Sequence, residues 1–236
     1  MSSLIVALHA RRCALCMEDA ITLIACGVGV GLASAKLFYL IFSVGIIPVF
    51  ESIQRGDYSI FWDSGMVFYG GMLGGVAGAF LGAKIFKISL LDYEPVIVPC
   101  LPLGHAFGRL GCFLSGCCYG IAYDGPCSVV FPRFAIGTIP EVPVFPIQLL
   151  EMALNIGLFS VLIKYAKKDR PPYAVLGLYL STYATLRFLL EYLRADSERG
   201  MYYFLSTSQW ISLFLLIFCT GFGGTIWFRY KKSLNH

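Results

Sequence analysis

Residues 66–86 read MVFYGGMLGGVAGAFLGAKIF, a run of 21 residues with one charged side chain, Lys84. A helix of this length spans about 30 Å, which is the thickness of the hydrocarbon core of a bilayer. Comparable apolar blocks lie at 20–50, 95–117, 147–165, 173–193 and 208–228. Because the apolar residues come in blocks and do not alternate with polar ones, the pattern predicts transmembrane helices and not a β-barrel.

The composition is also typical of a membrane protein. Of the 236 residues, 58% are hydrophobic and 14% are charged, whereas an average soluble domain carries about 25% charged residues. We therefore predict an all-α, polytopic integral membrane helical bundle with about six full transmembrane helices, in a single domain over residues 1–236. The block 20–50 is too long for one straight span, so we expect a tilt or break at 45–48. Residues 1–10 are apolar but too short to span, as if a first helix were truncated.

The distribution of Lys and Arg predicts the orientation of the chain in the membrane. Basic residues on one set of connections outnumber those on the opposite set by eleven to four. The richer set is Arg11, Arg12, Lys84, Lys87, Lys164, Lys167, Lys168, Arg170, Arg229, Lys231 and Lys232, and the poorer set is Arg55, Arg133, Arg194 and Arg199. Both ends of the chain should then face the cytoplasm. The net charge of +4 is spread over short loops without a dense basic run, so we expect no nucleic-acid partner.

Small residues recur at every fourth position of two predicted spans. The rows are Gly70, Gly74, Gly78 and Gly82; Gly71, Gly75, Ala79 and Ala83; and Gly104, Gly108, Cys112, Gly116 and Gly120. Such rows let helix backbones approach closely in lipid. Packing explains most of these glycines, but it does not explain the charged residues beside them.

Three basic side chains lie inside the predicted spans: Lys36, Arg109 and Arg187. A charge near the bilayer centre costs about 2.5–3.5 kcal/mol on insertion scales, so something must offset it. One interpretation is an internal salt bridge that only holds the bundle together. The other, which we favour, is a buried anion site, because the planar fork of arginine binds two phosphate oxygens at once. His105 lies one turn before Arg109 and is either a hydrogen-bonded structural residue or a spare base.

Further polar residues lie at helical spacing around these arginines. Arg187, Glu191 and Arg194 share one helical face, so Glu191 can hold both guanidinium groups in place. Gly108 and Gly111 flank Arg109 near the outward end of its span and leave room for a lipid headgroup. A second polar stripe on the fourth span consists of Gln148, Glu151 and Asn155. Arginines that converge near the outer leaflet predict a phospholipid-headgroup site.

Four segments together resemble one known family. The segment GRLGCFLSGCCYG at 108–120 resembles the signature of bacterial prolipoprotein diacylglyceryl transferases. The pair WDSGM at 62–66 and FYGG at 68–71 is similar to the family's Asp-Gly-Gly-Met and His-Gly-Gly segment. PIQLLE at 146–151 and RFLLE at 187–191 resemble two further family segments, and all four occur in the family's order.

The resemblance implies an activity, partners and a location. The family transfers the diacylglyceryl group of phosphatidylglycerol to the lipobox cysteine of a prolipoprotein signal peptide, so that a thioether forms and glycerol phosphate leaves. The implied partners are phosphatidylglycerol, prolipoproteins and the lipids of the bacterial inner membrane, with no cofactor or metal. The implied catalytic residues are Arg109, Arg187 and Glu191. The implied substrate-binding residues are Tyr69, Gly70, Gly71, Gly108, Gly111, Gly120, Gln148, Glu151 and Arg194.

Four positions depart from the family pattern. Cys112 and Ser115 stand where the family has Asn, Cys117 where it has Glu, and Tyr69 where it has His. A candidate base for the incoming thiol is therefore missing. The departures motivate an alternative, in which a divergent relative binds phospholipid or lipoprotein without transfer, or uses its cysteines for thiol or redox chemistry. A transporter with a buried anion site is a third class, but the internal inverted repeat typical of transporters is not visible.

The cysteines leave several interpretations open. Those near the predicted outward face are Cys112, Cys117, Cys118 and Cys127. Inert packing, a disulfide from Cys127 to Cys117 or Cys118, and metal or redox chemistry are the alternatives there. The spacing matches no standard zinc pattern. Cys13 and Cys16 form an isolated Cys-x-x-Cys, which is half of such a pattern.

Overall fold

A computed structural model describes residues 17–63, 65–132, 142–168, 171, 173–195 and 201–234. Most of these residues are helical, as the apolar blocks predict. The described chain forms two compact units, an N-terminal unit that ends at Tyr93 and a C-terminal unit that begins at Glu94. Each unit has its own helix packing.

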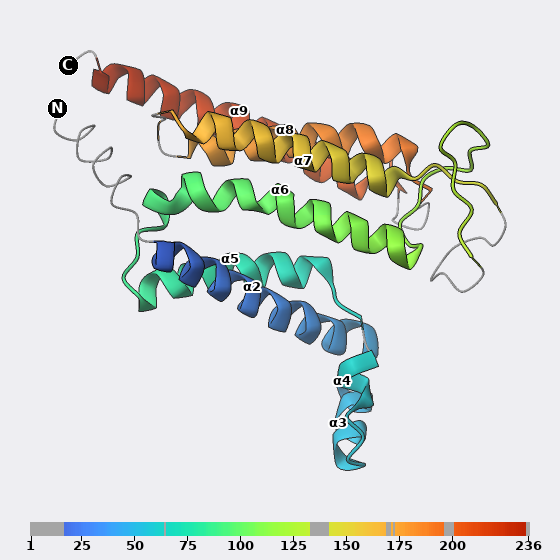
Figure 1. The fold of residues 1–236 in the computed structure, drawn as a ribbon. Helices are drawn as coiled ribbons and strands as arrows, with labels where there is room; N and C mark the ends of the chain where they lie inside the picture. The colour runs from blue at the N-terminus through green and yellow to red at the C-terminus, as the bar shows by residue number, and fades with distance from the viewer. Residues whose placement is uncertain are drawn as a thin grey trace. The chain divides into compact units, whose positions relative to one another are not determined.

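The N-terminal unit begins with a helix that breaks where the sequence predicts (Figure 1). Its helices are α2 (Met17–Tyr39), the π-helix η1 (Leu40–Val44), α3 (Ile46–Gln54), α4 (Ser59–Asp63) and α5 (Phe68–Ile85). The break expected at 45–48 is confirmed at Gly45, whose φ of 93° lies in the left-handed region that favours glycine. Beyond Gly45, α3 turns away from α2 (Figure 1).

The predicted glycine row at 70, 74, 78 and 82 is the surface along which α5 meets α2. A Cβ atom at Gly70 would lie 2.9 Å from the carbonyl oxygen of Ser34, and one at Gly78 would lie 2.5 Å from that of Cys26. Such distances leave no space for a side chain. The close backbone approach that the row predicts is therefore confirmed for this pair of helices.

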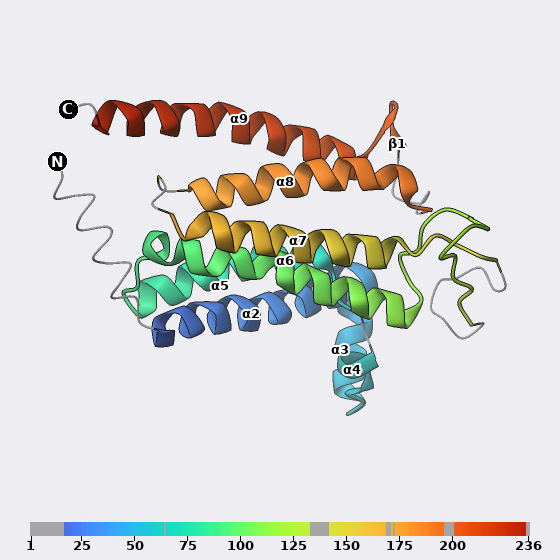
Figure 2. The same cartoon turned by 45° about the horizontal axis from the view of Figure 1, so that its top comes forward.

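The described part of the C-terminal unit contains four long helices, α6 to α9, and a short hairpin (Figure 2). Its elements are α6 (Leu90–Ser115), which starts in the N-terminal unit, α7 (Ile147–Ala166), α8 (Ala174–Leu190), the 3-10 helix η2 (Glu191–Leu193), β1 (Met201–Tyr202), β2 (Leu205–Ser206) and α9 (Thr207–Leu234). The helices agree with the predicted apolar blocks to within a few residues, except that α6 starts earlier and α9 runs further. The sequence does not predict the antiparallel hairpin of β1 and β2, because two-residue strands carry no alternating pattern.

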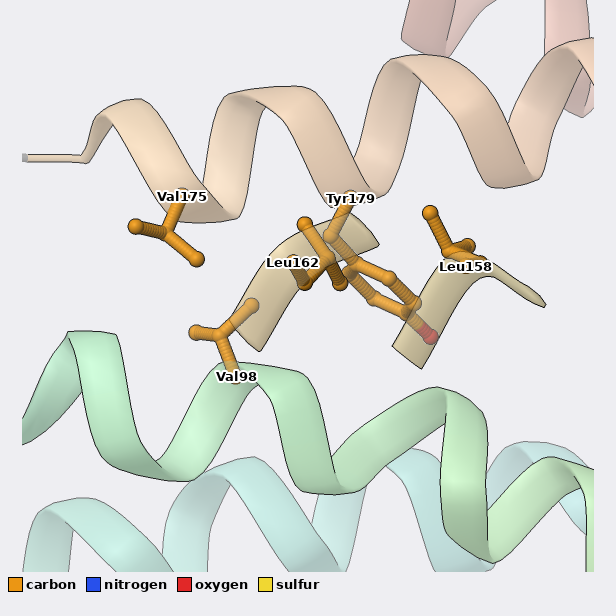
Figure 3. Packing of buried hydrophobic residues seen from close by; sticks show 5 residues of the cluster. All are labelled: Val98, Leu158, Leu162, Val175 and Tyr179. Atoms are coloured by element: carbon orange, nitrogen blue, oxygen red, sulfur yellow. The ribbon is translucent and has the colours of Figure 1, made fainter. Parts of the chain in front are cut away.

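An apolar core joins α6, α7 and α8 (Figure 3). Val98 of α6, Leu158 and Leu162 of α7, and Val175 and Tyr179 of α8 are all buried and point toward one another. In lipid, close packing of this kind holds helices together, because the surrounding acyl chains are as apolar as the side chains. The core therefore fixes the three helices that, between them, carry most of the predicted site.

A carboxylate of α6 fixes the start of α8. The two oxygens of Glu94 accept hydrogen bonds from the backbone N–H groups of Tyr173, at 3.2 Å, and Leu176, at 2.8 Å. The first N–H groups of a helix have no partner within the helix, and its positive dipole end favours an anion. Glu94 thus anchors α8 to α6 at the end of α8 that lies far from Arg187.

Several helices are suited to a lipid environment. Within the described residues, the segments long and apolar enough to cross a membrane are Met17–Val44, Leu90–Ser115 and Ile147–Ala166, and shorter apolar helices cover Gly70–Phe86 and Thr207–Gly221. Large apolar side chains point outward on these helices, among them Phe80, Phe214 and Ile217, each more than 60% exposed. Lipid accommodates such surfaces, so the structure agrees with a helical membrane bundle. The count of six spans stays a prediction, and residues 1–10 lie outside the described residues.

Candidate active site

Three arginines converge on one carboxylate in the C-terminal unit. Nε of Arg109 on α6 pairs with Oε2 of Glu151 on α7. Nη1 of Arg194 donates a hydrogen bond to Oε1 of Glu151 at 3.1 Å, and Nη1 of Arg187 on α8 lies 3.8 Å from the same oxygen. The Glu151 side chain is 5% exposed, so the junction is shielded from solvent. The sequence predicts each of these residues as part of the site, but not that Glu151 joins the arginines.

Two further contacts fix the guanidinium group of Arg187. Its Nη2 lies 2.9 Å from Oε2 of Glu191, where the i, i+4 spacing places it, and donates a hydrogen bond to Oγ of Ser208 on α9 at 3.0 Å. Its Nη1 has no hydrogen-bond partner among the described residues. Arg187 is therefore held through its Nη2, whereas its buried Nη1 lies near Glu151 without forming a hydrogen bond to any described residue.

The chain after α6 sets the position of Arg194. Gly120 and Arg194 form an antiparallel bridge, and the N–H of Ile121 donates to the carbonyl oxygen of Leu193 at 3.0 Å. A Cβ atom at Gly120 would lie 2.7 Å from the carbonyl oxygens of Leu193 and Phe145. Gly120 thus has a steric role, because only the absence of a side chain lets these backbones meet. The Arg194 side chain is 2% exposed, so this backbone pairing determines where its charge lies.

The end of α6 folds the chain back over the helix. Gly116 has a φ of 69°, its N–H donates to the carbonyl oxygen of Phe113, and the N–H of Cys117 donates to that of Cys112. These two bonds form a Schellman motif, in which a left-handed glycine closes a helix. The motif places Cys117 over Cys112, and Cys118 follows at a φ of 59°. The Sγ atoms of the three cysteines consequently lie within 4.8 Å of one another.

The thiols beyond the helix end differ in their acidity. The hydrogen bond with Cys112, together with the charge of Arg194, holds the pKa of Cys118 well below its usual value. Burial, together with the charge of Cys118, raises the pKa of Cys117. A lowered pKa favours the thiolate form, so Cys118 is the more acidic of these two thiols. Cys127 is exposed and lies outside this group. All the cysteines that the structure describes are free thiols, so the disulfide from Cys127 to Cys117 or Cys118 is not formed.

An aromatic cluster adjoins the arginines. The Oη of Tyr179 lies 3.4 Å from Nδ1 of His105. This contact agrees with the interpretation of His105 as a hydrogen-bonded structural residue. The ring centres of His105 and Tyr183 are 5.1 Å apart. Tyr183 precedes Arg187 by one turn of α8. A small recess between α7 and α8 is lined by Glu151, Leu154, Asn155, Tyr183, Leu186, Arg187 and Leu190. Our sequence interpretation missed Tyr183, although its i, i+4 spacing from Arg187 was a signal that could have found it.

Other predicted substrate-binding residues support or surround the cluster. Nε2 of Gln148 on α7 donates to the carbonyl oxygen of Cys117 at 2.8 Å, so it holds the turn after α6 against α7. Gly108 and Gly111 are exposed on either side of Arg109 along the chain, and a Cβ atom at either would meet no described atom within 4 Å. Neither glycine is therefore needed for helix packing among the described residues, and a role of the two in leaving room for a headgroup stays a prediction.

The remaining predicted residues belong to the N-terminal unit. Tyr69, Gly70 and Gly71 lie in the first turn of α5. A Cβ atom at Gly70 would crowd Phe38 of α2, and one at Gly71 would lie 3.3 Å from Cβ of Ala35. Gly70 and Gly71 thus have packing roles, and a role of this turn in substrate binding stays a prediction.

The chain is similar to known proteins over most of its length. The sequence profile of the prolipoprotein diacylglyceryl transferase family matches residues 2–226. The chain belongs to this family. Its signature at 108–120 comprises the end of α6, the Schellman turn with its three thiols and the bridge to Arg194.

Similar members of the prolipoprotein diacylglyceryl transferase family come from several bacteria. The chain is 32% identical over 204 residues to phosphatidylglycerol–prolipoprotein diacylglyceryl transferase 2 of Clostridium perfringens, which covers 86% of this chain and 75% of that protein. It is 32% identical to the phosphatidylglycerol–prolipoprotein diacylglyceryl transferase of Clostridium tetani, over 79% of this chain and 72% of that protein. Identity to the Vibrio atlanticus enzyme of the same name is 38%, over 66% of this chain and 56% of that protein.

Proposed function

We propose that this chain is a membrane enzyme that transfers the diacylglyceryl group of phosphatidylglycerol to the lipobox cysteine thiol of prolipoproteins. The observation that carries the proposal is the junction of Arg109, Arg187 and Arg194 at Glu151, inside a bundle of the transferase family. The names of the relatives specify phosphatidylglycerol and prolipoproteins as the substrates of those proteins.

The arginine cluster supports recognition of a phosphodiester. The side chain of Arg109 is 22% exposed, and its two flanking glycines carry no side chain that could cover it. Nη1 of Arg187 is buried, lies 3.8 Å from Glu151 and makes no hydrogen bond among the described residues, while Glu191 and Ser208 hold its Nη2. Two partly accessible guanidinium groups can together contact the phosphate oxygens of one headgroup, and each fork is suited to two oxygens.

The same arginines support the chemistry of the leaving group. When the glyceryl carbon–oxygen bond breaks, negative charge develops on the phosphate of the departing glycerol phosphate. Cations that are fixed before the reaction and shielded from water stabilise such charge without reorganisation. In this proposal Arg109 and Arg187 contact the phosphate, Glu191 orients Arg187, and Glu151 with Arg194 holds the cluster together.

The location that the proposal requires is the outward side of the bacterial inner membrane. Among the described residues, Lys84 and Lys87 lie at or just after the end of α5, and Lys164, Lys167 and Lys168 lie at or just after the end of α7. Arg109 lies near the end of α6 and Arg194 follows α8. The positive-inside rule then predicts that the arginine cluster lies near the outer leaflet and that both chain ends lie in the cytoplasm.

The test is transfer to a synthetic lipobox peptide in vesicles that contain the purified protein and radiolabelled phosphatidylglycerol. Arg109→Ala and Arg187→Ala should each lower the transfer rate by about 100-fold or more, the usual effect of losing one charge-stabilising donor. Arg187→Lys keeps the charge but not the fork, so it should recover only part of the rate.

The matched control is Arg55→Ala. Arg55 pairs with Glu51 in an exposed i, i+4 bridge of the N-terminal unit, with its side chain 75% exposed, so its loss should leave the rate within about twofold. Full activity of Arg109→Ala and Arg187→Ala would refute the arginine assignment. A wild-type protein that binds phosphatidylglycerol but transfers nothing would favour the divergent, non-transferring relative.

A further inference from the structure

The three clustered thiols lie close enough together to bind one metal ion, although their spacing in the sequence matches no standard zinc pattern. Cys112, Cys117 and Cys118 follow the pattern C-x4-C-C, yet their Sγ atoms lie within 4.8 Å of one another. Sulfurs bound to one zinc ion at about 2.3 Å in a tetrahedron lie about 3.8 Å apart. Small side-chain rotations therefore bring this cluster to zinc geometry, and the Schellman turn at Gly116 supplies the convergence.

The number of ligands distinguishes between two kinds of zinc site. Structural zinc ions take four protein ligands, whereas catalytic ones take three and keep one position open. Among the described residues, the group of possible ligands consists of these three cysteines and no fourth thiol, imidazole or carboxylate. All three cysteines are partly exposed, so a ligand from another molecule could reach a metal ion bound to them.

The surroundings compensate the charge of such a site. Three thiolates around one divalent cation leave one net negative charge. Arg194 and Arg109 both act on Cys118 electrostatically, so positive charge is already in place beside the sulfurs. The cluster also adjoins the phosphate-binding arginines, because Gln148, one turn before Glu151 on α7, holds the carbonyl oxygen of Cys117.

The proposed reaction needs what an open zinc position supplies. Its nucleophile is a thiolate, and the resemblance indicates that Tyr69 stands where the family has His. A thiol that binds zinc loses its proton, so the metal replaces a base. We propose that Cys112, Cys117 and Cys118 bind a zinc-class divalent ion whose open position receives the cysteine thiol of the incoming precursor; this inference rests on the proposed function.

The bonds and charges of this step balance without an oxidant or reductant. The precursor thiol binds the ion and releases its proton to solvent. Its sulfur then forms a bond to the glyceryl carbon of phosphatidylglycerol, while the bond from that carbon to the phosphate oxygen breaks. The electron pair of the broken bond leaves with glycerol phosphate next to Arg109 and Arg187. The neutral thioether is a weaker ligand than the thiolate, so the product can dissociate.

The first experiment measures zinc binding and not activity. It uses full-length protein with Cys13→Ser and Cys16→Ser, so that the isolated Cys-x-x-Cys contributes nothing. Competition against a chromophoric zinc chelator should give one tightly bound ion per chain. Cys117→Ser should weaken binding at least 100-fold, and Cys112→Ser should do the same. The matched control, Cys127→Ser, removes an exposed thiol outside the cluster and should bind as tightly as the parent.

The second experiment tests the open position with cobalt in place of zinc. A lipobox peptide should increase the thiolate-to-cobalt charge-transfer absorption by about one third, because a fourth sulfur joins three. The same peptide with serine in place of its cysteine should cause no increase. An unchanged spectrum with the cysteine peptide, or zinc binding that survives both Cys112→Ser and Cys117→Ser, would overturn the proposal.

Failure of this inference differs from failure of the proposed function. A protein that transfers diacylglyceryl groups at an undiminished rate when its zinc is fully removed would retain its function and refute the metal site. A protein that binds one zinc ion at the three cysteines and adds the peptide thiol, but transfers nothing, would support the site and refute the transferase assignment.

Discussion

Glu151 carries one negative charge but faces three guanidinium groups. An isolated carboxylate inside an apolar bundle is costly, and so is each isolated arginine, because removing an ion from water costs several kcal/mol. Their junction offsets part of that cost, and the contacts of Glu151 come from α6, α8 and the segment after η2. A residue that the sequence places in a substrate-binding stripe is thus also the residue on which the local structure depends.

Substitution Glu151→Gln should damage both stability and activity. It leaves buried arginines without their anion, which typically costs about 3–5 kcal/mol. We expect a clearly lower thermal unfolding midpoint in detergent and at least a 100-fold lower transfer rate. Glu51→Gln is the matched control, since the Glu51 side chain is 53% exposed and its pair with Arg55 contributes at most about 1 kcal/mol. Equal unfolding midpoints for the two variants would contradict the central role of Glu151.

The end of α6 is the element that organises the site. Within 108–120, one helix terminus presents Arg109, closes with Gly116, gathers three thiols and then pairs with the Arg194 segment through Gly120. These roles depend on a backbone that reverses direction in a few residues. A left-handed glycine makes the reversal possible, because residues with a Cβ atom adopt this conformation less readily.

Substitution Gly120→Ala should separate the two segments that position Arg194. The added Cβ atom would lie 2.7 Å from two backbone carbonyl oxygens, which cannot move as a flexible side chain does. We expect the transfer rate to fall at least tenfold. Gly157→Ala on α7 adds the same atom where no described atom lies within 4 Å, so it should be neutral or stabilising by up to about 1 kcal/mol. Wild-type activity of Gly120→Ala would show that the close approach is not needed.

At the scale of the whole molecule, two features are typical of a membrane protein. The helices carry apolar side chains on their outer surfaces, and the basic residues are distributed unequally along the chain. The connection between α6 and α7 holds Cys127. The connection between α7 and α8 begins with Lys167 and Lys168, and Lys164 lies in the last turn of α7. From the positive-inside rule we therefore expect these two connections on opposite sides of the membrane.

Thiol labelling of spheroplasts tests this orientation. In a variant whose only cysteine is Cys127, a membrane-impermeant maleimide should label the protein in intact spheroplasts, because this thiol is exposed and expected outside. A variant whose only cysteine comes from Lys168→Cys should be labelled only after the membrane is permeabilised. The reverse pattern would show that the predicted orientation is wrong.

The amino-acid sequence by itself determined the helical blocks, the break at Gly45, the close-packing row of α5 and the candidate arginines. These features follow from local rules, since lipid demands long apolar helices, glycine permits left-handed turns, and residues four apart share a helical face. The sequence also indicated the family, because each segment that resembles the family is a continuous stretch of the chain.

Only the tertiary structure decided which charged groups meet. Arg109, Glu151 and Arg194 are distant in the chain and approach because three helices and a backbone bridge converge. The three thiols meet because the chain reverses at Gly116, which gives C-x4-C-C the geometry of a cluster. Spacing along a chain predicts contacts on one helix face, whereas contacts between helices depend on how those helices pack, and packing has no local signature in the sequence.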